Sequence, residues 1–428
     1  MMRKRLSALI LLLLTVALSS TTVSVAAAEA PVTVTAWFYS GSPAVSEWAK
    51  EFNARFNANN PDIKLEFQLM AYDQINTGLI VAAASGVGPD IAYFPANLIP
   101  GRIAQGLTTP LNRYLDAWPD SKDFIPDLLK AVTDADGRVH ALPFAMWGIF
   151  DLYNTDMFLA SALTMPHDWD SLLQTARKLT TYNSDGSVRT YGYACSHTLT
   201  LAIYNLELAM QQLGKGMISI GDTSVDLNNE RATTALNFLQ ELWQTGMPDG
   251  NSGASDLSFS VNGRTAIQGY ATYNLLDIAP SNTTSLEPRR VVGPNAGQDL
   301  IRFNAGMLYI LSTSKHPDAA WRVLADFTSP DNSAGYLQAQ VSYLPVRRSV
   351  LAKMSTIVTH PLALKMAQLM YSPMTTYGAV HEYWAAIHPV GAPLILSVLQ
   401  GKRAIPGTLE EAERLMNAAL AEQLSRAK

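Results

Sequence analysis

Apolar residues alternate between strand-like and helix-like patterns from residue 32 onward. Residues 32–37 alternate small apolar side chains with Thr or Trp, which predicts a strand. Residues 45–56 then place Val, Trp, Ala and two Phe on one helical stripe, and residues 63–69 alternate again. Asn60-Pro61 ends the helix, because a residue before proline disfavours the α region. This strand–helix–strand start is typical of an open sheet that binds ligands at its strand ends.

The second half of the chain continues the same alternation. Residues 169–179, 232–243 and 317–327 each carry a helical apolar stripe, separated by shorter strand-like segments. Strands and helices in alternation predict an α/β fold. With 48% apolar residues the chain can build large cores, and its length of 428 residues suggests two or more domains.

The first residues predict export from the cytoplasm. Three basic residues at positions 3–5 precede an apolar run over residues 6–18 and a small-residue segment over 25–28. This pattern predicts a signal peptide over residues 1–28, cleaved after Ala28. The apolar run is shorter than the roughly 20 residues that a spanning helix needs. The only cysteine is Cys195, so neither a lipid anchor at the cleavage site nor an intrachain disulfide is expected.

Charge and motifs argue against several function classes. The net charge of −5 disfavours nucleic-acid binding, which needs clustered Lys and Arg. No G-x-S-x-G, H-E-x-x-H or P-loop pattern occurs, so no enzyme activity and no cofactor is predicted. His381, Trp384 and His388 share one helical face, but the two histidines are about 10 Å apart, too far for one metal ion. We expect no metal site, and we expect Pro389 to kink or end this helix.

Several segments together resemble one protein family. They are SGVGPDIAYFPANLIPGRIAQGLTTPL at 85–111, GRVHALPFAMWGIFDLYNTDMF at 137–158, GRTAIQGYATYNLLDIA at 263–279, the run 306–330, VSYLPV at 341–346 and LQGKRAIPGTLEEAERLMNAAL at 399–420. In order and spacing they resemble extracellular solute-binding proteins of bacterial ABC importers. The resemblance covers nearly the whole chain after the signal peptide. It is to the carbohydrate-binding type, similar to maltose/maltodextrin- and glycerol-3-phosphate-binding proteins.

The resemblance implies a two-lobed, Venus-flytrap α/β fold with a hinge between two open-sheet lobes. Residues 31–141 and 303–329 would form the N-terminal lobe, and residues 142–302 and 330–428 the C-terminal lobe. Hinges would lie near 141–144, 300–304 and 329–332. The family role implies a periplasmic or otherwise extracytoplasmic monomer that delivers its solute to the permease subunits of an ABC transporter.

The resemblance also implies which residues face the ligand. Tyr and Trp offer an apolar ring and a polar tip, which suits the C–H-rich faces and the hydroxyl groups of a sugar. For each implied position the alternative is ordinary packing in a core. The implied ligand-facing residues are Tyr39, Ser40, Phe94, Asn97, Trp147, Tyr204, Tyr273, Asn304, Tyr343, Trp384 and His388.

These residues favour a neutral sugar, either a mono- or an oligosaccharide. Asn97 is neutral where many sugar binders of the family carry a carboxylate, and His388 stands where a phosphodiester-binding relative has Arg. No Arg or Lys belongs to the predicted site, whereas phosphate ligands need Arg, Lys or helix N-termini. A polyol or glycerol-phosphate-type solute is the alternative ligand. A secreted glycosidase is a remote alternative, because two facing carboxylates leave no spacing signature.

Overall fold

The computed structural model describes residues 30–39, 42–196, 198–219, 221–271, 279–341, 343–370, 375–377 and 381–426. The predicted signal peptide, Ser40 and Tyr273 lie outside the described residues, so what the sequence predicts for them stays a prediction. A search of the described residues for a helix both long and apolar enough to span a bilayer finds none.

The N-terminal strand–helix–strand unit forms as the sequence predicts. Strand β1 (Val32–Tyr39) pairs in parallel with β2 (Ile63–Met70), starting from Val32 opposite Ile63. Helix α2 (Pro43–Asn59) connects them and buries Val45, Ala49, Phe52 and Phe56 of the predicted stripe, while Trp48 is half-buried. Ser42 caps this helix by accepting a hydrogen bond from the Val45 amide at 3.3 Å, which satisfies one of the free N–H groups of the first turn.

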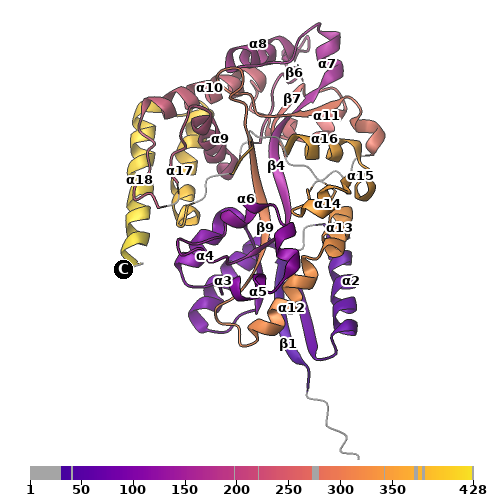
Figure 1. The fold of residues 1–428 in the computed structure, drawn as a ribbon. Coiled ribbons are helices and arrows are strands. Elements are labelled where there is room, and N and C mark those ends of the chain that lie inside the picture. Colours follow the sequence, from indigo (N-terminus) through magenta and orange to yellow (C-terminus); the bar gives the residue numbers. More distant parts are fainter. Residues whose placement is uncertain are drawn as a thin grey trace, which may run out of the picture.

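One mixed sheet runs through the molecule in the strand order β2-β1-β3-β9-β4-β7. Its centre is an antiparallel pair of two long strands, β4 (Leu142–Asn154) and β9 (Ile301–Ile310). Figure 1 shows β4 and β9 passing from the lower to the upper half of the molecule. The remaining strands of this sheet are β3 (Ile91–Pro95), β7 (Ile267–Ala271), β8 (Leu286–Arg289), which pairs with β4, and β10 (Thr375–Tyr377), which pairs with β9.

The helices and the sheet form two large cores. The first core is centred on β1, β2 and β3, includes the apolar stripes of α2 and α12 (Pro317–Phe327), and continues along β4 to Leu257, Leu286 and Met366. The second core is mostly helical and gathers side chains from α8 (Trp169–Leu179), α9 (Leu199–Gln212), α10 (Glu230–Gly246), α17 (Trp384–Leu399) and α18 (Ile405–Arg426). The first lobe occupies the lower half of Figure 1 and the second lobe the upper half. The predicted two-lobed α/β fold is therefore confirmed.

The shorter elements complete the two lobes. Helix α13 (Pro330–Ala339) packs against α2 of the first lobe and against α12, although the sequence assigns residues from 330 onward to the second lobe. The lobe boundaries and hinges themselves stay a prediction. The other elements are α3 (Tyr72–Ser85), α5 (Asn112–Leu115), α6 (Pro126–Lys130), α7 (Thr155–Ala160), α11 (Leu257–Val261), α14 (Arg348–Leu351), α15 (Met354–Ile357), α16 (Pro361–Met370), and the pair β5 (Thr181–Tyr182) and β6 (Val188–Thr190).

The lobes meet where a short helical segment of the first lobe contacts α17 of the second. This segment consists of the 3₁₀ turn Ala96–Leu98 and helix α4 (Ile99–Ala104). Leu98 packs against both cores. A Cβ placed on Gly101 would lie 2.4 Å from the carbonyl oxygen of Glu382, so only glycine allows the two backbones to approach this closely.

One local alternative is wrong. Helix α17 does not end at Pro389 but continues through both Pro389 and Pro393 to Leu399, while the expected kink stays a prediction. The missing N–H of Pro389 would have bonded to Ala385, which lies on the exposed face of the helix where water can satisfy its carbonyl group. Tyr204 lies inside α9, which begins directly after its N-cap residue Thr198.

Candidate functional site

Four predicted residues form a hydrogen-bonded chain that joins the two lobes, here called the interlobe chain: Asn304, Asn97, Tyr204 and Trp384. Asn304 Nδ2 donates to Asn97 Oδ1 at 2.7 Å, and Asn97 Nδ2 donates to the Tyr204 hydroxyl at 3.1 Å. The same hydroxyl accepts from Trp384 Nε1 at 3.0 Å. All four side chains are buried, so each bond lies in a low-dielectric setting where a missing partner is costly. The chain runs from the 3₁₀ turn and β9 to α9 and the first residue of α17.

Trp147 stands beside this chain on the neighbouring strand. It is paired with Asn304 across β4 and β9, and side chains directly opposite in an antiparallel pair share one face of the sheet. Trp147 is half-buried, whereas the other residues of β4 are buried. An accessible indole within a buried strand is the kind of surface on which a ligand ring can stack.

A second group of aromatic residues continues from Trp147, here called the tyrosine group: Tyr39, Tyr93, Tyr336 and Tyr343. The Trp147 ring stacks on Tyr343 with centroids 5.2 Å apart and planes at 25°. A bridge between Met146 and Leu344 holds the 343–345 segment against β4 and so positions Tyr343. Tyr39 stacks on Tyr93 at 6.0 Å, and Tyr336 lies 6.1 Å from Tyr343. Burial raises the pKa of Tyr343 to about 12, so its hydroxyl keeps its proton and can donate.

Arg302 is a charged member of the site that the sequence did not predict. Its guanidinium carbon lies 3.8 Å from the centroid of the Tyr204 ring, and the residue is 7% exposed. The structure therefore places a buried guanidinium beside the predicted site, which the sequence argument for a neutral ligand did not include. The sequence contained a signal for Arg302, because this residue precedes Asn304 by two positions. On a strand the two side chains therefore share one face of the sheet. A guanidinium at this distance stabilises the Tyr204 ring by a cation–π contact.

His388 presents a defined acceptor next to the interlobe chain. Its ring stacks near Trp384 at 5.3 Å and near Tyr204 at 5.9 Å. Nδ1 lies 2.8 Å from the Trp384 carbonyl oxygen, which can only accept, so Nδ1 carries the proton. Burial lowers the pKa of His388, with a further contribution from the Arg302 charge. The neutral ring therefore leaves Nε2 as a hydrogen-bond acceptor.

Glu207 is a buried acid one turn beyond Tyr204 on α9. Its Oε2 accepts from the Met217 amide at 2.7 Å and its Oε1 from Gln211 Nε2 at 2.8 Å. Burial raises the pKa of Glu207 to about 7, although these two hydrogen bonds and the charges of Arg302 and Arg231 oppose the rise. A lone acid in the apolar run of α9 was the sequence signal for such a group.

The raised pKa makes stability depend on pH in a predictable direction. The folded pKa of Glu207 lies above its ordinary value of 4.5, so the folded state binds more protons and stability falls as pH rises from about 4.5 to above 7. The replacement Glu207→Gln removes the charge. We expect the free energy of unfolding of this variant, relative to wild type, to rise by about 2.5 kcal/mol between pH 5 and pH 8. Urea unfolding across this range measures it.

The exposed Glu410→Gln serves as the matched control for Glu207→Gln, since it lies on the surface of α18. Its free energy of unfolding should stay parallel to that of wild type at every pH. Equal pH profiles for wild type and Glu207→Gln would contradict the assignment of a buried, titrating acid.

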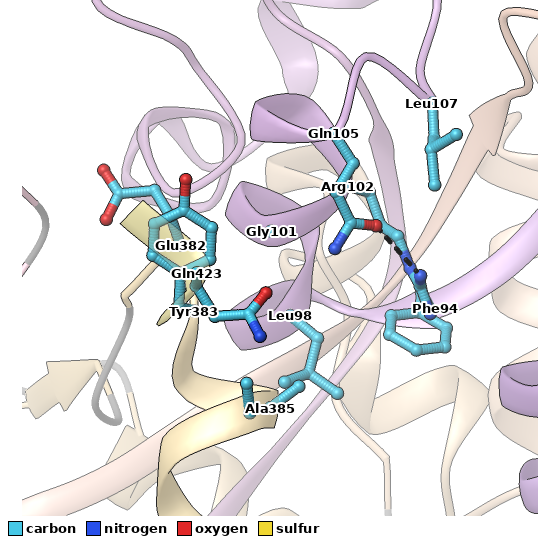
Figure 2. A pocket seen from close by; sticks show the side chains of 11 residues that line it. Phe94, Leu98, Gly101, Arg102, Gln105, Leu107, Glu382, Tyr383, Ala385 and Gln423 are labelled. Atoms are coloured by element: carbon cyan, nitrogen blue, oxygen red, sulfur yellow. Dashed lines mark hydrogen bonds between the residues drawn. The ribbon is translucent and has the colours of Figure 1, made fainter. Parts of the chain in front are cut away.

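Phe94 lies apart from the interlobe chain and lines a pocket beside it. The pocket has a volume of about 390 Å³ and is formed by α4 on one side and by the start of α17 and the end of α18 on the other. In Figure 2 the violet helix α4 crosses the pocket and the yellow start of α17 lies next to it. The Arg102 guanidinium lies 4.6 Å from the Phe94 ring centroid, and the ring itself is buried.

The arrangement as a whole is suited to binding a polar solute. It combines aromatic faces with amide, hydroxyl, imidazole and guanidinium groups that act as both donors and acceptors. Such a combination holds a polar ring-shaped solute in a fixed orientation. Across the described parts of the chain, no cluster of three or more His, Cys, Asp or Glu side chains is arranged to hold a metal ion.

Two curated relatives of this chain are named as binding proteins. Proteins of Brucella abortus (strain 2308) and Brucella suis biovar 1 (strain 1330), each provisionally named a binding protein, are 22% identical to this chain over 389 residues, which is 89% of this chain and 91% of theirs.

Solved structures of similar fold include several solute-binding proteins. An ABC transporter solute-binding protein of Thermotoga lettingae, bound with alpha-D-tagatose, has a TM-score of 0.74 at 20% identity and covers 91% of this chain and 100% of its own. The sugar-binding protein MalE of Xanthomonas citri has a TM-score of 0.75 at 19% identity, covering 92% and 98%. A substrate-binding protein of Listeria monocytogenes in complex with cycloalternan has a TM-score of 0.74 at 19% identity, covering 91% and 99%.

The family itself follows from the sequence match. Residues 40–334 match the family described as bacterial extracellular solute-binding protein. This span contains Trp147, Tyr204 and the Asn97–Asn304 pair, and it exceeds half of the chain. The chain therefore belongs to the family of bacterial extracellular solute-binding proteins.

Proposed function

We propose that this protein captures a neutral sugar between its two lobes and delivers it to the membrane permease of an ABC transporter. The observation that carries the proposal is the interlobe chain beside the half-buried Trp147. Stacking on Trp147 would hold the apolar face of the sugar ring. Its hydroxyl groups would exchange hydrogen bonds with Asn97, Asn304 and His388. The sugars named for the tagatose- and cycloalternan-bound relatives support the same ligand class.

Lobe closure is the proposed mechanism of capture. A ligand that contacts both lobes binds the closed arrangement more tightly than the open one and so shifts the population toward it. The long strands β4 and β9 connect the lobes, so small backbone rotations near 141–144 and 300–304 would separate them. The closed surface would then dock on the permease.

A glycerol-phosphate-type or polyol solute is the second candidate. Arg302 favours it, because a buried guanidinium can pair with a phosphate. The guanidinium already lies against the Tyr204 ring, and Glu207 supplies an opposite charge in its field. These two partners reduce the positive charge available to a ligand, so we prefer the neutral sugar.

The proposal also covers the export of the protein, its oligomeric state and the fate of the bound sugar. Residues 1–28 would be removed on export, which would leave a monomer without a lipid anchor in the periplasm or an equivalent compartment. The sugar would be bound and released without chemical change.

Thermal unfolding against a ligand panel tests the ligand class. We would heat residues 29–428 with mono- and oligosaccharides, polyols, sugar phosphates and amino acids. A ligand at about 100 times its Kd adds about 2.7 kcal/mol to the stability of the folded state. We expect a rise in Tm of several degrees with neutral sugars only. A rise restricted to phosphates or polyols would overturn the neutral-sugar proposal in favour of the second candidate.

A further inference from the structure

Residues 344–349, here called the strap, directly follow Tyr343 of the tyrosine group. At the start of the strap, Leu344 and Met146 of β4 exchange two backbone hydrogen bonds, which are 2.7 and 3.0 Å long. Met146 precedes Trp147, and the ring of Trp147 stacks on that of Tyr343. The position of the strap on β4 therefore determines how the Tyr343 ring meets the indole.

The strap contains an arginine, Arg347, that is completely buried. Its guanidinium donates to two backbone carbonyl groups, from Nε to that of Thr328 and from Nη1 to that of Asp120, the second at 2.9 Å. Nη1 also lies 3.4 Å from Asp123 Oδ2. One side chain thus connects the strap to the C-terminal end of α12 and to the 3₁₀ helix Pro119–Asp123.

The same carboxylate also holds the end of the strap. Asp123 Oδ1 accepts from the Ser349 amide at 2.9 Å, and Oδ2 accepts from the Ser349 hydroxyl at 2.6 Å. Between these contacts, the Ile125 amide donates to the Val346 carbonyl oxygen at 2.9 Å. Asp123 therefore joins Arg347 and Ser349, and the strap cannot shift along β4 without breaking these bonds.

A buried arginine contributes less to stability than its many contacts suggest. The guanidinium loses its hydration, and an apolar side chain of similar volume often stabilises a protein as well or better. What the guanidinium adds is geometry, because its planar fork of N–H groups fits its acceptors in one orientation only.

The acceptors of Arg347 lie on segments that lead to the tyrosine group. Thr328 ends α12 and stands two residues before α13, and α13 carries Tyr336. The ring of Tyr336 lies 6.1 Å from that of Tyr343. Arg347 therefore fixes the strap relative to the helix that packs beside the Tyr343 ring.

We propose that Arg347 is a positioning residue for ligand binding, which fixes the strap so that Tyr343 holds the Trp147 ring in the orientation on which a sugar stacks. The proposal rests on the proposed function and adds to it a residue that does not touch the ligand, because Arg347 is fully buried. Without the guanidinium the Tyr343 ring no longer has one fixed position against the indole. Affinity should then fall although every group that contacts the ligand is still present.

A double-mutant cycle tests whether Arg347 acts through Tyr343. Arg347→Met keeps an apolar stem and removes the guanidinium. With the neutral sugar of the ligand panel that raises Tm most, we expect calorimetry to show a Kd about fivefold or more above that of wild type. In a Tyr343→Ala background the same replacement should change Kd by less than about twofold, because the ring that Arg347 positions is already absent.

Near-UV circular dichroism of the ligand-free protein gives a readout that a loss of stability alone would not change. Aromatic side chains contribute to this spectrum when packing holds them in a fixed orientation. The difference between the spectra with and without Trp147→Ala isolates the contribution of this indole. We expect this difference to become smaller when both proteins also carry Arg347→Met, at a temperature where all four variants are folded.

Three further variants make the result specific. The matched control Arg348→Met changes the next residue of the strap, whose side chain is exposed, and should keep the Kd and the difference spectrum of wild type. Arg347→Lys keeps the charge without the fork and should give a Kd between those of wild type and Arg347→Met. Asp123→Asn removes the charged partner at a side chain that is 22% exposed, and it provides the same cycle if Arg347→Met does not fold.

The contrary outcomes separate this inference from the proposed function. An equal loss of affinity from Arg347→Met with and without Tyr343, or a Kd equal to that of Arg348→Met, would overturn the positioning role while leaving sugar capture intact. An unchanged difference spectrum would overturn the fixing of the Trp147 ring by Arg347. If no neutral sugar of the panel binds to wild type, sugar capture fails and the role of Arg347 in affinity fails with it.

Discussion

Replacing Trp147 by alanine is expected to weaken sugar binding by about 2 kcal/mol, roughly 30-fold in Kd. Trp147 is the half-buried residue of the otherwise buried strand β4, and it lies opposite Asn304. Its ring stacks on Tyr343, which fixes the orientation of the indole. A ligand ring that stacks on the indole would lose most of its apolar contact in the variant. Calorimetry with the best-binding sugar of the panel measures the change.

The matched control for Trp147→Ala is Trp321→Ala. Trp321 also stacks on a tyrosine, with its centroid 4.8 Å from that of Tyr114, but it belongs to α12 of the first lobe. Its removal should lower Tm without changing Kd. If Trp147→Ala and Trp321→Ala leave the same Kd, the ligand does not stack on Trp147.

Replacing Gly101 by alanine is expected to weaken binding by about tenfold or more, although Gly101 belongs to neither the interlobe chain nor the tyrosine group. The new Cβ would lie 2.4 Å from the carbonyl oxygen of Glu382, well inside the roughly 3.5 Å at which such atoms attract. The contact involves backbone, which cannot rotate away like a side chain. The variant therefore favours an arrangement in which α4 and α17 are further apart, and a ligand must spend part of its binding energy to close the lobes.

Gly407→Ala is the matched control for Gly101→Ala. Gly407 also lies within a helix, and a Cβ there would meet no atom within 4 Å. Each replacement of glycine by alanine within a helix stabilises the folded state by about 0.5–1 kcal/mol through helix propensity. This contribution is the same in both variants, so it cancels when their Kd values are compared. Binding by Gly101→Ala as tight as by Gly407→Ala would show that the contact between α4 and Glu382 has no part in capture.

The elements of the fold were predictable because each one satisfies a local rule. The stripe of α2, the alternation of β2 and the stripe of α8 follow from their residues alone. The pairing of β4 with β9 could not be derived in this way, since it joins segments about 150 residues apart. The same pairing brings Trp147 opposite Asn304, so the site depends on a contact that local patterns do not contain.

Only some residues of the candidate site could be named from the sequence, because the site depends on the same long-range pairing. The resemblance supplied Asn97, Tyr204 and Trp384 by position, and the structure brings them into one hydrogen-bonded chain. It did not supply Arg302, whose position becomes evident only once Asn304 is placed on a strand. Nor did it supply Glu207, whose burial depends on the turn at 214–217 folding over α9. Their roles in ligand binding stay predictions until the variants are measured.

The most direct measurement is a calorimetric titration of residues 29–428 with the neutral sugar that raises Tm most, followed by chromatographic recovery of that sugar. We expect saturable binding of one sugar molecule per chain and recovery of the sugar unchanged. The absence of binding by every neutral sugar would contradict sugar capture, and recovery of a cleaved sugar would contradict a binding protein without enzyme activity.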